Sequence, residues 1–166
     1  MVSGVYSEGM KTFLVALSML AVASVSGAQN PVKWSLQGPR SLTVQPRAVI
    51  SLQVTAQIEN GWRVYSLTQP KGGPYGMTIT LLPGSRATFG GAVRAPAPVA
   101  KYDSSFKMMA ETYSGKAVFT IPLRAPGEEG TTSSTLKIRY QACNARFCLP
   151  PRNELIQLTL KVKSGA

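Results

Sequence analysis

The 166-residue sequence contains no histidine and only two cysteines. Without histidine it cannot assemble a Ser-His-Asp or Cys-His nucleophile, and it lacks the commonest metal ligand in proteins. Two cysteines cannot complete a four-ligand zinc site unless two chains share it or carboxylates fill it in. These absences argue against most hydrolases and metalloenzymes, and we expect neither a metal nor a cofactor.

Acidic residues are also scarce, with 7 Asp and Glu against 18 Lys and Arg, for a net charge of +11. Such an excess favours anionic partners. The basic residues are scattered, however, so a soluble basic surface is the simpler interpretation. The length is typical of a single domain, which is large enough to bury a core without the help of a disulfide.

Long hydrophobic runs are absent, and the longest, Thr12 to Val25, is shorter than a typical membrane span. Lys11 precedes it and Ser26-Gly27-Ala28 follows, which predicts a secretory signal peptide over residues 1–28. Met10 is the better translation start, which makes residues 1–9 a doubtful extension. An uncleaved anchor is the alternative. Export excludes nucleic acid as the natural partner and favours a disulfide between two close cysteines.

From Asn30 onward the pattern is that of successive strands. Ile50 to Ile58 alternates apolar and polar residues, Asn60-Gly61 forms a turn, and Trp62 to Leu67 is the returning strand. Further strands are predicted at 77–82, 86–93, 116–123, 136–142 and 156–162. Residues 101–113 show no strand or helix period, and residues 127–134 form a polar connector.

Seven to nine strands without a convincing helix indicate an all-β, immunoglobulin-like antiparallel β-sandwich. No internal repeat or second domain is evident, so we expect one domain over residues 30–163.

The two cysteines, Cys143 and Cys148, lie between two alternating runs and are followed by Leu149-Pro150-Pro151. A bridge that closes a loop of six residues stabilises the fold by roughly 2 kcal/mol, against about 4.7 kcal/mol for a hundred-residue loop, so stapling is a weak reason for it. Arg146 and Arg152 are close in sequence, and a guanidinium favours the thiolate that exchanges. Redox exchange and a structural disulfide both remain open. Copper(I) binding with Met108 and Met109 is a third, weaker alternative.

The block Tyr140-Gln141-Ala142-Cys143 to Cys148-Leu149-Pro150-Pro151 resembles the N-terminal periplasmic domain of DsbD, the thiol:disulfide interchange protein. Gly61 to Leu67 is similar to a strand of that family. Asp103 to Phe106, followed by Glu111-Thr112-Tyr113, resembles its cap over the disulfide. The resemblance extends from about Asn30 to Lys163.

The resemblance implies a periplasmic immunoglobulin-like domain that passes reducing equivalents to other proteins. Cys148 would form the mixed disulfide with a partner, and Cys143 would resolve it. Phe106 would be the tip of the cap, with Asp103 nearby and Tyr65 lining the site.

The implied partners are thioredoxin-like periplasmic proteins, including disulfide isomerases and cytochrome c maturation thioredoxins. The sequence ends at Ala166 and contains neither a membrane domain nor a thioredoxin-like domain. We therefore expect the electron donor to be a separate chain, either a membrane protein or a thioredoxin-like protein. We expect the protein to be a monomer. The alternative function is a secreted β-sandwich that binds other molecules and has a purely structural disulfide.

Overall fold

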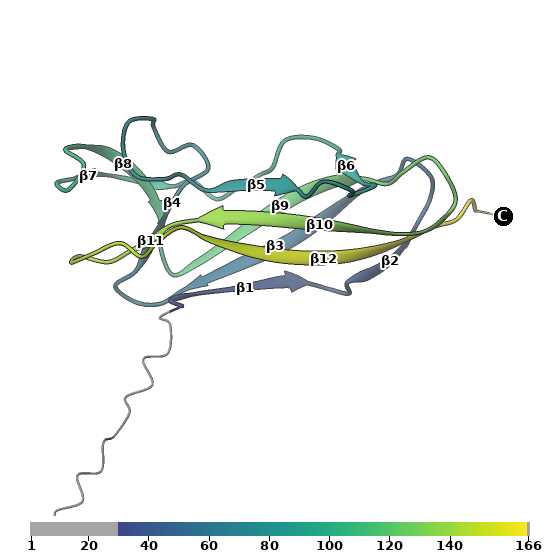
Figure 1. Ribbon diagram of the computed structural model, residues 1–166, viewed down its shortest axis with the longest axis horizontal. Helices are drawn as coiled ribbons and strands as arrows, with labels where there is room; N and C mark the ends of the chain where they lie inside the picture. Colours follow the sequence, from purple (N-terminus) through teal and green to yellow (C-terminus); the bar gives the residue numbers. More distant parts are fainter. Residues whose placement is uncertain (1–29, 166) are drawn as a thin grey trace, which may run out of the picture.

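The computed structural model describes residues 30–165, and all their regular elements are β-strands (Figure 1). The predicted signal peptide, residues 1–28, lies outside this range. Within the range, no helix is long and apolar enough to cross a membrane.

Two four-stranded sheets form a sandwich. The first contains, in spatial order, β1 (Val32–Gln37), β3 (Val49–Ile58), β9 (Lys116–Arg124) and β6 (Thr88–Phe89). The second contains β2 (Ser41–Val44), β12 (Arg152–Val162), β10 (Gly130–Tyr140) and β5 (Thr78–Leu81). Every strand pair is antiparallel except β2 and β12, which are parallel, so the antiparallel prediction is confirmed apart from this one pair.

The core lies between the two sheets and follows from the alternation of apolar residues along the strands. Val54 of β3 and Ile138 of β10 are both fully buried and belong to one cluster. The Trp34 ring of β1 lies 5.4 Å from the Tyr140 ring of β10, which joins the two layers directly. Each fully buried aliphatic side chain contributes about 1.5–3 kcal/mol relative to its exposed state, so this core can support the domain without the disulfide.

A third sheet extends one end of the sandwich, opposite the C-terminus (Figure 1). Its spatial order is β11 (Ala142–Cys143), β4 (Arg63–Tyr65), β8 (Met108–Tyr113) and β7 (Val99–Asp103). This small sheet brings together the cysteines and the segment predicted to form a cap.

Four predicted elements need correction. The strand predicted at 86–93 is only the two-residue β6. Residues 101–113 are not irregular, because β7 and β8 form a regular hairpin that pairs Tyr102 with Met109. The strand after Asn60-Gly61 does not return along β3. It is the shorter β4, which pairs with β8 and β11 in the third sheet. The polar segment 127–134 is a connector only as far as Glu129, because β10 begins at Gly130.

Candidate functional site

The two cysteines lie in the loop that connects β10 to β12. We call residues 141–151 the Cys loop. Cys143 is in β11 and forms an isolated antiparallel bridge with Cys148, and the two are joined by a disulfide with their Cα atoms 4.0 Å apart. The N–H of Leu149 donates to the carbonyl of Ala142 at 2.9 Å, which continues the ladder beyond the bridge. The disulfide therefore closes a narrow two-stranded tip, as predicted for a pair at a turn.

Asn144 shapes the turn between the cysteines. Its side-chain Oδ1 accepts hydrogen bonds from the N–H groups of Arg146 and Phe147, at 2.8 and 2.9 Å. Its own N–H donates to the carbonyl of Phe147 at 3.0 Å. The exposed Phe147 ring packs edge-on against Trp62, with 5.6 Å between centroids. Asparagine favours turns because its side chain can bond the backbone two residues on.

The two cysteines differ sharply in exposure. Cys143 is fully buried, in a small cluster with Tyr65 and Ala110, whereas Cys148 is exposed. An incoming thiolate must reach a sulfur from solvent. The accessible cysteine of the pair is therefore Cys148.

The segment predicted to form a cap is the turn of the β7–β8 hairpin, and we call this turn the cap. Asp103, the last residue of β7, accepts hydrogen bonds at Oδ1 from the N–H groups of Ser105 (3.0 Å) and Phe106 (3.4 Å). Its Oδ2 accepts from the Tyr65 hydroxyl at 3.0 Å and from Arg63 Nη2 at 3.4 Å. One carboxylate thus orders the turn and attaches it to β4.

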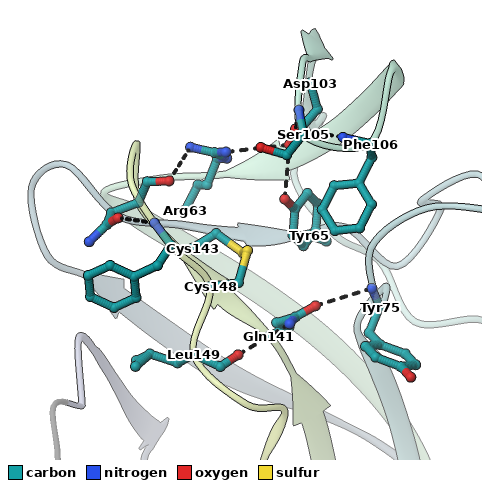
Figure 2. Close-up of a disulfide and its surroundings, with 12 residues drawn as sticks. Arg63, Tyr65, Tyr75, Asp103, Ser105, Phe106, Gln141, Cys143, Cys148 and Leu149 are labelled. Carbon is teal, nitrogen blue, oxygen red and sulfur yellow. Dashed lines mark hydrogen bonds and ion pairs between the residues drawn. A yellow bond between two sulfur atoms is a disulfide. The ribbon is translucent and has the colours of Figure 1, made fainter.

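Phe106 projects from this turn toward the disulfide region (Figure 2). Its ring meets the buried Tyr65 ring edge-on, with 6.3 Å between centroids, and 37% of the residue remains exposed. Asp103, Phe106 and Tyr65 are thus in mutual contact beside Cys143. The structure brings these three predicted residues together, while their roles in exchange stay predictions.

Charges in the cap network shift two pKa values. Burial raises the pKa of Asp103, but hydrogen bonds from Tyr65, Ser105 and Phe106 and the charge of Arg63 outweigh burial and hold it below its ordinary value. Burial raises the pKa of Tyr65, and the hydrogen bond to the Asp103 carboxylate raises it further. At neutral pH Asp103 is therefore an anion and Tyr65 a neutral donor.

Arg63 is a site residue that the sequence analysis missed. Its Nη1 donates to the carbonyl of Asn144 in the Cys loop at 3.2 Å, while Nη2 donates to Asp103 in the cap (Figure 2). It therefore ties the cap to the Cys loop. Since residues two apart on a strand point to the same side, its position two before Tyr65 was the available signal.

The two arginines predicted to stabilise a thiolate occupy different positions, one within the Cys loop and one just after it. Arg146 is exposed at the tip of the Cys loop, and Arg152 begins β12 opposite Tyr140. Between residues 30 and 165, neither side chain forms an ion pair or a hydrogen bond. Their influence on the sulfurs stays a prediction.

Gln141 anchors the other side of the Cys loop. Its Nε2 donates to the carbonyl of Leu149 at 3.2 Å, and its Oε1 accepts from the N–H of Tyr75 at 3.3 Å (Figure 2). The loop before β5 is thereby fixed beside the cysteines.

For a metal, the part of the chain that the structure describes offers no group of three or more His, Cys, Asp or Glu side chains. Met108 packs against Gly73, and Met109 is 53% exposed. The Met108 side chain of β8 therefore packs against the loop before β5.

The fold and the site together define a class: a β-sandwich domain that carries a disulfide at one end, with one cysteine exposed beside an aromatic cap. The family model described as "Thiol:disulfide interchange protein DsbD, N-terminal" matches residues 35–160. The chain belongs to this family and is a thiol:disulfide exchange domain with a disulfide pair. The family is periplasmic.

One solved structure supports the fold, and a second is reported with it. The N-terminal periplasmic domain of ScsB from Proteus mirabilis has a TM-score of 0.52 at 15% identity, over 76% of this chain and 44% of that one. The DsbD N-terminal domain of Neisseria meningitidis in the reduced form has a TM-score of 0.48 at 18% identity, over 67% of this chain and 78% of that one. No curated protein sequence matches the chain.

Proposed function

We propose that this domain, over residues 30–163, relays reducing equivalents to thioredoxin-like partners, including those of cytochrome c maturation, with Cys148 as the exchanging sulfur. The observation that carries the proposal is the contrast between a fully buried Cys143 and an exposed Cys148. Exchange proceeds by attack of a thiolate on a disulfide sulfur through a mixed disulfide, so the accessible sulfur is the one that meets another protein.

Loading requires two electrons from a donor dithiol on another chain. A donor thiolate attacks Sγ of Cys148, the Cys143–Cys148 bond breaks, and Cys143 leaves as a thiolate that takes up a proton. The second donor thiol loses its proton and attacks the donor sulfur of the mixed disulfide. The donor leaves as a disulfide, and this domain holds two thiols.

Delivery of the reducing equivalents to a partner runs the same exchange in the opposite direction. The Cys148 thiolate attacks a partner disulfide, and the partner's second sulfur leaves as a thiolate. Cys143 then attacks Sγ of Cys148, which re-forms the internal disulfide and releases the partner as a dithiol. Arg146 and Arg152 would favour the attacking thiolate by their charge. No cofactor enters either sequence.

The cap would limit this reaction to suitable partners. Phe106, packed on Tyr65, would narrow the directions from which another molecule approaches the disulfide, although Cys148 itself is exposed. A protein partner that moves the cap aside would gain the wider access that in-line attack on the Cys148 sulfur needs. Export by the signal peptide predicted over residues 1–28 would deliver the chain to the periplasm, where such partners work.

Single-cysteine variants test the order of attack, with glutathione disulfide as the probe. Reduced Cys143→Ala should form a mixed disulfide with glutathione at Cys148 and keep it, because the resolving thiol is missing. Reduced Cys148→Ala should react far more slowly, because its remaining thiol is buried. Mass spectrometry of quenched samples measures both. Equal rates for the two variants would abolish the assignment, and a faster reaction of Cys148→Ala would reverse it.

A further inference from the structure

A groove of about 360 Å³ lies beside the cap. Its walls come from β4 with Arg63, β7 with Lys101 and Asp103, β8 with Ala110, and the Cys loop with Ala145. Ala145 precedes Cys148 by three residues in the Cys loop, so the groove borders the loop that a partner must approach.

The groove is positively charged. Arg63 and Lys101 line it, against the single carboxylate of Asp103. That carboxylate already accepts four hydrogen bonds, from Tyr65, Arg63, Ser105 and Phe106. In the described range no carboxylate lies within ion-pair distance of Lys101. The groove therefore carries one more positive than negative charge, and its single carboxylate is already engaged in hydrogen bonds.

Arg63 retains donors for a ligand. A guanidinium has five N–H groups, and only two are used, toward Asn144 and Asp103. The 3.4 Å contact with Asp103 is longer than the 2.7–2.9 Å usual for charge-assisted hydrogen bonds. The Arg63 side chain is also 32% exposed, so a second carboxylate can reach it without displacing Asp103.

We propose that this groove binds an acidic side chain, Asp or Glu, that the redox partner carries next to its disulfide. The partner's carboxylate accepts from the free N–H groups of Arg63 and pairs with the Lys101 ammonium. Guanidinium and carboxylate groups match in geometry, so the contact orients the partner as well as attracting it. This inference rests on the proposed function, because it concerns the substrate preference of the same exchange reaction.

Synthetic peptides provide a direct test. Each contains a Cys-x-x-Cys disulfide and one Glu placed one, two or three residues before the first cysteine, and each has a twin with Gln at that position. The full reduced protein is mixed with each peptide, and the rate of peptide reduction is measured by quenched-flow separation. At low salt, at least one Glu peptide should react about two- to fivefold faster than its twin, which corresponds to one partly exposed ion pair.

Lys101→Gln should reduce this preference, because the variant lacks the ammonium but keeps Arg63 and every described hydrogen bond of the cap. Lys163→Gln is the matched control and should leave the preference unchanged. Lys163 is exposed and directly follows β12, which leads to the C-terminus at the end of the sandwich opposite the third sheet (Figure 1). The preference should also shrink in 1 M salt, where the screening length falls to about 3 Å.

Equal rates for every Glu and Gln pair, with both peptides reduced, would overturn the groove assignment and leave the exchange function intact. A Glu preference that Lys101→Gln does not reduce would also overturn it, because the carboxylate would then bind elsewhere. If no peptide is reduced by the wild-type protein, the proposed function fails and the inference fails with it.

Discussion

Replacing Phe106 with alanine should make the reduced protein more reactive toward small reagents. Phe106 is 37% exposed and its ring meets the Tyr65 ring edge-on at 6.3 Å, an aromatic pair that adds to the Asp103 hydrogen bonds holding the cap on β4. Such a pair contributes about 0.5–1.5 kcal/mol beyond the area it buries. If opening of the cap widens access to the Cys148 sulfur, losing that energy should raise the reaction rate by up to about tenfold.

The assay is the rate of alkylation of the reduced protein by iodoacetamide at pH 7, followed by mass spectrometry and restricted to Cys148. Phe89 provides a matched control, because it is 38% exposed but lies on β6, at the other end of the sandwich (Figure 1). Phe89→Ala should leave the rate unchanged. A Phe106→Ala rate within error of wild type would show that the ring does not shield Cys148.

Two further variants address the network beneath the cap. Tyr65→Phe should lower the free energy of unfolding by about 1.5–3 kcal/mol in urea melts, because the buried Asp103 carboxylate loses a donor to a charged group; an unchanged midpoint would mean that this bond adds nothing. Asp103 has a folded pKa below its unfolded value, so its stabilisation is present above about pH 4 and is lost as the pH falls through the lowered folded value. Asp103→Asn should therefore be less stable at pH 7 and flatten the dependence of stability on pH below about 4, whereas parallel pH profiles for the two proteins would contradict that linkage.

Much of the sandwich was predictable because its strands have one buried face. Leu52, Val54, Ala56 and Ile58 are all buried along β3, as their alternation with polar residues indicates. Leu136 and Ile138 of β10 are buried in the same way. The position of the Cys loop between β10 and β12 was therefore predictable too. Wherever one side of a strand meets the core and the other meets water, the period of two is visible in the sequence.

The hairpin of the cap was missed for the converse reason. β7 lies at the edge of the third sheet, beyond the main core, and four of its five residues are exposed, so no alternation marks it. The partner of β4 was mistaken because Asn60-Gly61 signals a tight hairpin, whereas β4 gains its ladder from β8 and β11. Pairing between strands distant in sequence is not encoded by any local pattern.

The site was only partly visible in the sequence. Cys143 and Cys148 were evident from composition alone, and Asp103, Phe106 and Tyr65 followed from the family resemblance. Arg63 was not evident from the sequence, because its role depends on the Cys loop lying on one side of β4 and the cap on the other. Arg146 and Arg152 were chosen for closeness in sequence, yet the guanidinium that bonds the Cys loop and the cap comes from a strand some eighty residues earlier.

The reduction potential of the Cys143–Cys148 pair tests the central claim most directly. It can be measured by equilibrating the intact domain in glutathione buffers and trapping the thiols by alkylation. A relay must be both reducible and oxidisable by other proteins, so we predict a potential above about −300 mV, in the range of thioredoxins and disulfide isomerases, roughly −270 to −180 mV. A potential well below about −300 mV is typical of inert structural bridges and would contradict the account.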